Sequence, residues 1–251
     1  MRDLQGVIRQ RHSARVPFDP ERPVSHEALA EILEAASWAP TAHNMQNYEV
    51  IVVEDPSILR RLGDLKSGLS VEFIRENYKQ LSFSEEELKK KKTGIMASMF
   101  PPSWRDPALF SRLEEAAFAE GPSFMSQTIR HSPTVLVVTY DTRKRAPASE
   151  GDVLGFISLG CVLQTMWLVS ESLGIGFQVM SAFSSPAVEP GVRKILGFPE
   201  HEKIAYAVRL GYPQKESEPE LQKYLRVRRD ISDFVHLNRY GENFPSIQEK
   251  S

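Results

Sequence analysis

The chain has 251 residues, of which 41% are hydrophobic and 25% are charged, a balance typical of a globular protein with a sizeable core. Its formal net charge of −2 excludes the strong basic excess that most nucleic-acid-binding proteins show. The single cysteine, Cys161, excludes an internal disulfide and favours a reducing compartment. No apolar stretch with a cleavage site follows Met1, so we expect a cytoplasmic protein without a signal peptide.

The N-terminal part predicts two helices and a strand. Residues 3–12 predict a short helix, and Ser25 caps a clearer one, HEALAEILEAAS, whose apolar residues follow the i, i+3, i+4, i+7 spacing. Pro40 ends this helix, because the residue before a proline avoids helical geometry. After the polar loop TAHNMQN, the β-branched stretch YEVIVV predicts a buried strand.

Residues 55–121 differ in character from the chain on either side. Ser84 and Glu87 have the spacing of a capping box, and residues 85–87 are glutamates that each precede a lysine by four positions. Aromatic residues and prolines follow this solvated helix. We therefore expect a mostly helical excursion, which could be a lid over a pocket or an extra packing layer.

A long apolar segment, residues 154–173, raises the question of a membrane span. Gln164, Ser170 and Glu171 interrupt it, so no long apolar run remains between polar positions. We interpret it as a fully buried core helix that ends at Gly174. Such a helix often packs against a symmetry mate, which favours a dimer.

Three further strands are predicted around this helix. They are TVLVVTY (134–140), FQVMS, and KIAYAVRLGYP, and a helix that ends at Gly197 precedes the last of them. One face of the last strand is expected to be formed by Ile204, Tyr206, Val208 and Leu210. The order predicts one α+β domain over residues 1–251, with the excursion at about 55–121 and a basic, aromatic C-terminal extension at about 219–251.

Motifs of several common chemistries are missing from the sequence. It has no P-loop and no G-x-S-x-G nucleophile elbow, and Gly174-Ile-Gly176 lacks the third glycine of a dinucleotide fingerprint. The six histidines lack metal-ligand spacing, so we expect no metal site. Cys161 lies among apolar residues and fits an inert thiol.

Two polar stretches remain as candidates for a site. In RHSAR, Arg11 and Arg15 offer planar, charged donors and Ser13 adds a hydroxyl, a set that suits a phosphate. Alone, this cluster could equally be a surface salt-bridge cluster. In APTAHNMQNY, Asn44 and Gln46 could present amides to the edge of a polar ring, or they could satisfy backbone groups within a turn.

Together and in this order, the motifs resemble the nitroreductase family of flavoproteins. RHSARVPF and APTAHNMQNYEVIVV are similar to the family's opening patterns, SLGCVLQTMWLVSESLGIGFQV to its long central helix, and ILGFPEHEKIAYAVRLGYP to its final strand. The resemblance covers most of residues 7–53 and 130–213. It implies an α+β fold with a mostly antiparallel sheet flanked by helices, a long buried central helix, and an intertwined homodimer that holds FMN at its interface.

The resemblance also implies which residues hold FMN. The phosphate and the ribityl chain would be bound by Arg11, His12, Ser13 and Arg15. The ring would be lined, with a backbone N–H near its N5 atom, by Met180, Ser181 and Ala182. From the partner subunit, the ring would be faced by Pro40, Thr41, Ala42 and Asn44. The phosphate site would be completed by Arg226 and Arg228, with Arg229 and Arg239 as competitors.

The activity that the resemblance implies is that of an FMN-dependent oxidoreductase. NADPH or NADH would reduce FMN and leave, and a nitroaromatic, a quinone or a similar small acceptor would take the electrons in the same pocket, a ping-pong mechanism. The flavin carries this chemistry, so no catalytic side chain is expected.

Departures from the family pattern leave the acceptor open. Asn47-Tyr48 replaces the family's Pro-Trp, Ala42 stands where serine is common, and the excursion is long. One alternative is a relative of the same fold that fragments reduced flavin or removes halogen from aromatics. Another is a flavin-binding module without turnover. Reduction of bound flavin by NAD(P)H distinguishes the enzymes from the module.

Overall fold

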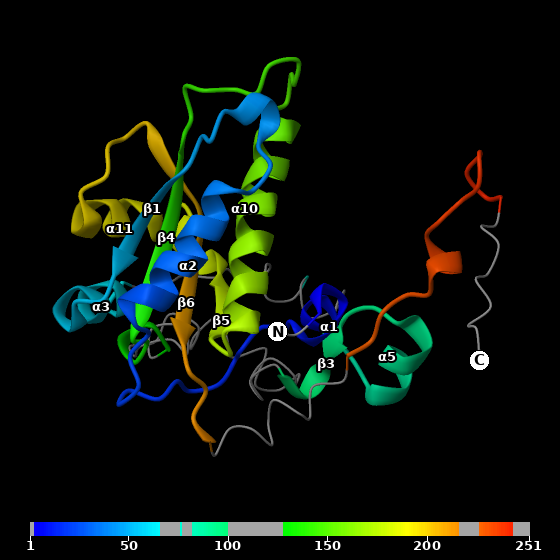
Figure 1. Ribbon diagram of the computed structural model, residues 1–251, viewed down its shortest axis with the longest axis horizontal. Helices are drawn as coiled ribbons and strands as arrows, with labels where there is room; N and C mark the ends of the chain where they lie inside the picture. Colours follow the sequence, from blue (N-terminus) through cyan, green and yellow to red (C-terminus); the bar gives the residue numbers. More distant parts are fainter. Residues whose placement is uncertain (1–2, 66–75, 77–81, 100–127, 216–225, 243–251) are drawn as a thin grey trace. The chain divides into compact units, whose positions relative to one another are not determined.

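The computed structural model describes residues 3–65, 76, 82–99, 128–215 and 226–242. The chain divides into two compact units, residues 1–67 with 121–221 and residues 68–120 with 222–251. The first unit contains the main sheet and its helices, including the start of the excursion, and the second contains the rest of the excursion and the C-terminal segment (Figure 1).

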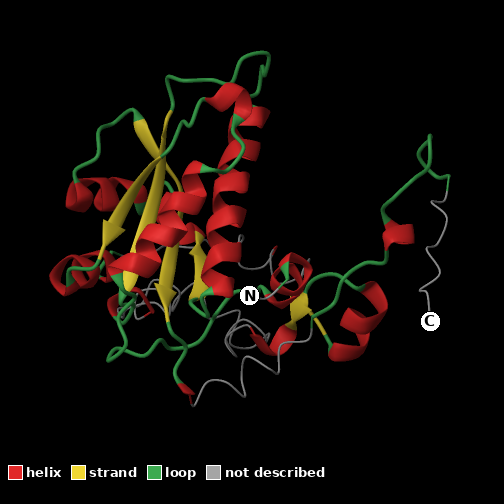
Figure 2. Cartoon of the chain, in the orientation of Figure 1, coloured by secondary structure: helices red, strands yellow, loops and turns green. Residues whose placement is uncertain are grey.

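A four-stranded antiparallel sheet forms the centre of the first unit (Figure 2). Its strands, in spatial order, are β1 (Glu49–Val53), β4 (Thr134–Asp141), β6 (Glu202–Gly211) and β5 (Gly176–Met180). All four predicted strands are therefore confirmed. The first is less buried than expected, because β1 forms an edge of the sheet and only Val53 in it is buried.

Helices cover both faces of this sheet (Figure 1). The core on one face includes residues of α2 (His26–Ser37) and α10 (Val153–Ser172), and the core on the other includes residues of α3 (Pro56–Gly63) and α11 (Glu189–Leu196). Successive residues of β4 alternate between these two cores. This explains why β4 is a continuous apolar run rather than an alternating one. The predicted α+β class is confirmed.

The face predicted for β6 is correct only in part. Tyr206 and Val208 lie in the core beneath α2 and α10, as expected, but Ile204 lies in the core on the opposite side. The pairing of β4 with β6 shifts between Val138 and Thr139, which leaves Ala205 as an extra residue. Because side chains alternate along a strand, one inserted residue moves every side chain beyond it to the other face.

The helix boundaries follow their predicted signals. Helix α1 (Leu4–Gln10) starts after Asp3, whose side chain accepts from the Gly6 N–H, and the Ser25 side chain likewise accepts from the Ala28 N–H in α2. The glycines after α10 and α11 have φ of 71° and 78°, in the left-handed region where glycine is favoured.

Helix α10 is buried on one side and exposed on the other. Leu159, Val162 and Met166 lie in the core, whereas Phe156 and Ile157 are 53% and 55% exposed. Helix α10 is therefore not buried on every side as expected, because within a single chain only one of its sides is covered. By length and composition alone the helix could span a membrane, but its core-facing residues pack against the sheet.

The second unit contains short elements in its described residues. A parallel pair of two-residue strands, β2 (Ser82–Phe83) and β3 (Ile95–Met96), flanks α5 (Glu85–Lys91), and the segment 226–242 carries a single 3-10 turn. The predicted capping box of Ser84 and Glu87 is confirmed, as is the ion pair between Glu85 and Lys89, at 2.6 Å. The aromatic centre predicted for residues 100–118 lies outside the described residues.

Candidate flavin site

The RHSAR segment runs beside the outer edge of the sheet. Ser13 forms a parallel bridge with Phe177 of β5, and the Ala14 N–H donates to the Phe177 carbonyl oxygen at 3.0 Å. The segment thereby extends the sheet by one short pairing. Ala14 is buried, Arg15 is exposed and the residues from Arg11 to Ser13 are half-buried. The sheet edge therefore fixes the backbone of the predicted phosphate-binding residues.

Trp167 of α10 orients the first two residues of this segment. The Arg11 guanidinium lies over the Trp167 ring at 4.4 Å, and the Phe177 ring stacks against the tryptophan at 5.0 Å. The indole N–H of Trp167 donates to the His12 carbonyl oxygen at 3.2 Å. One aromatic side chain thus holds both the backbone and the cationic side chain of the candidate phosphate site.

The two ring nitrogens of His12 have different surroundings. Its Nδ1 atom lies 3.1 Å from the Gln10 carbonyl oxygen and 3.8 Å from a carboxylate oxygen of Glu171. Its Nε2 atom is buried and has no hydrogen-bond partner among the residues that the structure describes. Because a buried polar atom normally has a partner, this atom fits a site that is completed by a bound ligand.

Arg209 of β6 binds the backbone at the C-terminal end of the RHSAR segment. Its side chain is almost completely buried, and its Nη2 atom donates to the carbonyl oxygens of Ala14, at 3.0 Å, and Val16, at 2.5 Å. Its Nε atom donates to the Gln178 side chain at 2.6 Å. Burial lowers the pKa of Arg209 to about 10, so the side chain stays charged at neutral pH.

Glycine allows the segment to lie this close to the sheet. A Cβ atom on Gly211 would lie 2.5 Å from the Phe18 ring, which is closer than real side chains approach. Phe18 in turn lies 4.0 Å from the Arg209 guanidinium. The glycine of the family-like RLGYP stretch is therefore explained by this contact.

The predicted ring-binding residues follow β5 directly. Met180 ends the strand, and Ser181 and Ala182 belong to the 3-10 helix η3 (Ser181–Ser184). An open groove of about 340 Å³ begins beside this turn, within the size range of small-molecule sites. It is lined from η3, α10 and the ends of β4 and β6 by residues that include Ser184, Phe156, Gly160, Tyr140 and Tyr206.

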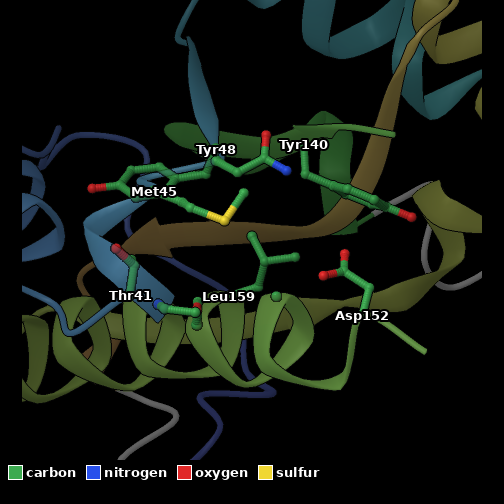
Figure 3. Close-up of a pocket in the computed structure, with 10 residues that line it drawn as sticks. Thr41, Met45, Tyr48, Tyr140, Asp152 and Leu159 are labelled. Carbon is green, nitrogen blue, oxygen red and sulfur yellow. The ribbon is translucent and has the colours of Figure 1, made fainter. Parts of the chain in front are cut away.

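The loop with Pro40, Thr41, Ala42 and Asn44 lies at the other edge of the sheet, before β1. Its Ala42 N–H donates to the Ser158 hydroxyl of α10 at 2.9 Å. Gln46 donates to the Asn44 side chain at 3.0 Å and through its backbone N–H to the Thr41 hydroxyl at 3.2 Å. The loop, Tyr140 and α10 enclose a cavity of about 20 Å³, room for about one water molecule (Figure 3).

Among the described residues of the first unit, RHSAR and the loop lie apart. RHSAR contacts α10 at Trp167 and the loop contacts it at Ser158, nine residues or about 13 Å apart along the helix. The loop and η3 lie at opposite edges, three strand spacings or about 14 Å apart. Arg226 and Arg228 are exposed and belong to the second unit, so their role at the phosphate stays a prediction.

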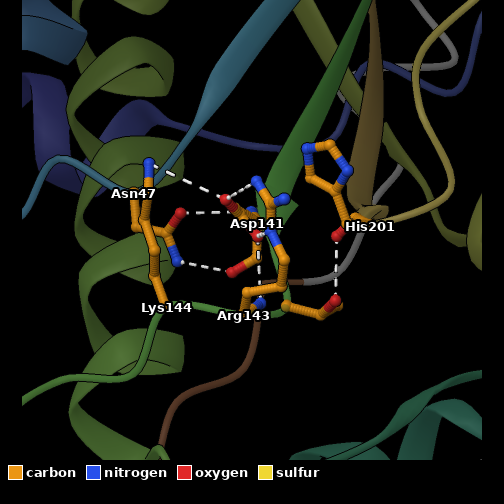
Figure 4. Close-up of polar contacts among 6 residues, drawn as sticks. Asn47, Asp141, Arg143, Lys144 and His201 are labelled. Carbon is orange, nitrogen blue, oxygen red and sulfur yellow. Dashed lines mark hydrogen bonds and ion pairs between the residues drawn. The ribbon is translucent and has the colours of Figure 1, made fainter.

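A separate polar cluster lies where β4 ends and β6 begins. Asp141, His201 and Glu202 bring possible metal ligands within 4.8 Å of one another. However, Arg143 holds both carboxylate oxygens of Asp141, and Lys144 lies 3.9 Å from one of them (Figure 4). Because Arg143 occupies both carboxylate oxygens of Asp141 and Lys144 adds a second cation beside them, we interpret the cluster as an ion-pair network around Asp141.

This network predicts a pH-dependent contribution to stability. Arg143 lowers the pKa of Asp141 well below its ordinary value. A carboxyl group of this kind stabilises the fold above its unfolded pKa, near 3.9, and loses that contribution as the pH falls through the folded value. Wild type should therefore melt above Asp141→Asn at neutral pH, with a difference that shrinks below about pH 4. A difference in melting temperature that is constant from pH 3 to pH 8 would contradict this.

Three contributors to the site were not predicted from the sequence: Trp167, Arg209 and Asn47. An arginine inside the apolar strand AVRLG was the one available signal, because a charged side chain at such a position must be buried with partners. The roles of the other two depend on contacts between residues more than 90 positions apart.

Two curated proteins that are named as oxidoreductases are similar to this chain. Among curated proteins, an NADH dehydrogenase of Thermus thermophilus is 25% identical over 210 residues, covering 78% of this chain and 81% of that protein. An NADPH-dependent oxidoreductase of Staphylococcus epidermidis is 22% identical over 244 residues, covering 94% and 74%.

Solved structures show the fold of the chain, and a family model shows its family. A nitroreductase with bound FMN from Bacteroides fragilis has a TM-score of 0.58 at 19% identity, covering 95% of this chain and all of that one. An FMN- and NADPH-dependent nitroreductase from Sphigopyxis sp. has a TM-score of 0.60 at 16% identity, covering 95% and 100%. These likenesses show the fold. The model of the nitroreductase family matches residues 8–212, and the chain therefore belongs to the nitroreductase family.

Proposed function

We propose that the protein is an FMN-dependent NAD(P)H oxidoreductase that reduces nitroaromatics, quinones or similar small acceptors by a ping-pong mechanism. Membership in the nitroreductase family supports the flavin and the redox activity. The observation that carries the proposal is the RHSAR segment, which the edge of the sheet and Trp167 hold in one defined conformation.

The residues present fit FMN. The donors of Arg11, Ser13 and Arg15 suit a dianionic phosphate. The buried Nε2 atom of His12 has no partner within the described part of the chain, and a phosphate or ribityl oxygen would supply one. β5 leads from this segment to the groove beside η3, so the phosphate and the ring would lie toward opposite ends of one strand. When bound, FMN would supply the redox chemistry by accepting electrons from NAD(P)H and passing them to an acceptor.

A second copy of the chain would complete the site. Pro40 to Asn44 precede the edge strand opposite the one that RHSAR and η3 adjoin, and the outer face of α10 exposes Phe156 and Ile157. Two copies that pack through α10 with a two-fold axis would cover this apolar face and bring the loop of each toward the flavin of the other. We therefore propose a cytoplasmic homodimer.

Replacing Arg11 by alanine should weaken FMN binding. Loss of one charged hydrogen bond typically costs about 1.5–3 kcal/mol, or roughly 10- to 150-fold in the dissociation constant. The constant can be measured by quenching of flavin fluorescence with the apoprotein. Arg22→Ala is the matched control, because this exposed arginine lies over the Tyr212 ring and outside RHSAR. Equal affinity in the two variants would contradict the placement of the phosphate.

The ping-pong mechanism makes a separate kinetic prediction. If the reductant and the acceptor use one pocket in turn, double-reciprocal plots at several acceptor concentrations should be parallel, and high acceptor concentrations should inhibit competitively against NAD(P)H. Lines that intersect would show that both substrates are bound together. That result would exclude the shared pocket while leaving the flavin site intact.

A further inference from the structure

Asn47 stands where the nitroreductase pattern has proline, and its amide makes two specific bonds. The Nδ2 atom donates to the Asp141 carbonyl oxygen, and the Oδ1 atom accepts from the Asp141 backbone N–H, each at 3.1 Å (Figure 4). Proline has no side-chain group that can form either bond. The exchange is therefore a feature of this chain rather than of the family pattern.

These two bonds continue the pairing of β1 with β4. Glu49 opposes Thr139, so position 47 opposes Asp141 in the same antiparallel register. The backbone turns away at this point, because Gln46 has φ of 45° and the Tyr48 N–H donates to the Gln46 carbonyl oxygen at 2.9 Å. The Asn47 side chain thus replaces a backbone peptide group and ties the end of the loop to the sheet.

Asp141, the residue of β4 to which Asn47 bonds, is held in place by further hydrogen bonds. Asp141 is 4% exposed, and its carboxylate accepts from the backbone N–H and the guanidinium of Arg143 at 2.9–3.0 Å. Next to it, the backbone N–H and the hydroxyl of Thr142 donate to the His201 carbonyl oxygen at 2.9 and 2.8 Å, which joins β4 to the start of β6. Asn47 therefore bonds to a rigid corner of the sheet.

The backbone conformation of the loop that Asn47 holds depends on contacts at both ends of the loop. Its residues His43, Asn44 and Gln46 have φ of 52°, 53° and 45°, in the left-handed region that non-glycine residues adopt only when surrounding contacts hold them there. Such contacts are provided at one end by Ser158, through the Ala42 N–H, and at the other end by Asn47. Removal of one anchor should let the loop relax.

We propose that Asn47 is a positioning residue for the electron acceptor. Its bonds to Asp141 hold residues 40–46 in the shape in which they cover the flavin of the partner subunit, and the loop thereby sets how acceptors are bound. The inference rests on the proposed function and on the proposed dimer. Since Asn47 lies at the opposite edge of the sheet from RHSAR, its loss should weaken FMN binding less than Arg11→Ala does.

The first test compares Asn47→Ala with Thr142→Val in the flavin-loaded protein. Loss of the two amide bonds should lower kcat/KM for a quinone about tenfold, mainly through KM, when it is measured at FMN concentrations that saturate the variant. Asn47→Asp, which keeps the acceptor atom and loses the donor, should show the same direction. Thr142→Val removes a bond at the same corner without touching the loop, so its KM should not change. A lower melting temperature without a KM change in Asn47→Ala would overturn the proposal.

The second test uses mixed dimers with one flavin each. When an Arg11→Ala chain is paired with an Asn47→Ala chain, the flavin is held by the second chain and covered by the intact loop of the first, so KM per flavin should match wild type. When an Arg11→Ala, Asn47→Ala chain is paired with wild type, the altered loop covers the flavin and the full KM defect should appear. The reverse pattern, or equal KM values, would overturn the proposal.

Different results would overturn the proposed function and the role of Asn47. A wild-type protein that binds no FMN would overturn the proposed function and this inference together. A wild-type dimer that binds FMN and reduces quinones, combined with mixed dimers of equal KM, would overturn the role of Asn47 alone.

Discussion

Replacing Gly160 by arginine is expected to convert the proposed dimer into a folded monomer that no longer retains FMN. Gly160 lies on the exposed face of α10, and no atom of its own chain lies within 4 Å of the position of an added Cβ. In a single chain the substitution should be neutral or slightly stabilising, because glycine costs about 0.5–1 kcal/mol in a helix relative to alanine. In a dimer packed through α10, the same side chain would meet the partner helix. Because Gly160 also lines the groove beside η3, the sedimentation result rather than the flavin content reports on the interface.

Sedimentation and flavin content together test this expectation. Ala30→Arg, on the exposed side of α2, adds the same side chain to a helix that the proposed interface does not use. This variant should remain a dimer and retain its FMN. Gly160→Ala should be close to wild type. If Gly160→Arg remains a dimer with full FMN content, then the outer face of α10 is not the interface, and the two-chain site is wrong.

Replacing Arg209 by methionine should lower the free energy of unfolding by about 3–5 kcal/mol and weaken FMN binding with it. The substitution leaves three buried acceptors, the carbonyl oxygens of Ala14 and Val16 and the side chain of Gln178, without their donor. Each unsatisfied buried group costs about 1–3 kcal/mol. The first two acceptors belong to the segment that carries the candidate phosphate site, so the cofactor should be lost before the fold.

Denaturant unfolding and flavin titration measure the two effects separately. Lys203→Met is the matched control on the same strand, where a half-buried lysine lies 3.5 Å from Glu189, and it should cost no more than about 1 kcal/mol. Arg209→Lys keeps the charge but not the planar fork, and it should fall between the two. Equal stability of Arg209→Met and Lys203→Met would show that Arg209 does not anchor the segment.

Signals that act within a few residues predicted the fold well. The side chain of Ser25 and the glycines at 174 and 197 mark helix ends because capping bonds and left-handed backbone are decided locally. The strands were found for a similar reason, since apolar runs rich in β-branched residues and bounded by turn residues are typical of strands. The class of fold followed from their order.

The errors in the fold came from neighbours that a sequence pattern does not specify. Ile204 changed faces because one residue bulges between β4 and β6, and alternation carries no mark of where a register shifts. β1 was expected to be buried because its composition matches that of a central strand, but its place at the edge depends on which strands pair. Helix α10 was expected to be covered all round, and within one chain its outer face is exposed.

The part of the site that is contiguous in the sequence was predictable, and the part assembled from distant elements was not. RHSAR could be recognised as an anion-binding stretch because its donors lie within a few residues of one another. Trp167, which orients Arg11, and Arg209, which holds the carbonyl oxygens behind it, come from a helix and a strand more than 150 residues away. Asn47 could be recognised as a departure from the family pattern, but its partner Asp141 is known only from the pairing of β1 with β4.

The central claim is that this chain holds a flavin that NAD(P)H can reduce. The most direct measurement is the visible absorption spectrum of the purified protein reconstituted with FMN, before and after NADPH or NADH is added without oxygen. The account predicts flavin absorption that stays with the protein through gel filtration and bleaches on addition of the nucleotide. A protein that leaves gel filtration colourless after incubation with FMN would contradict the flavin site, and bound flavin that neither nucleotide bleaches would contradict the proposed activity.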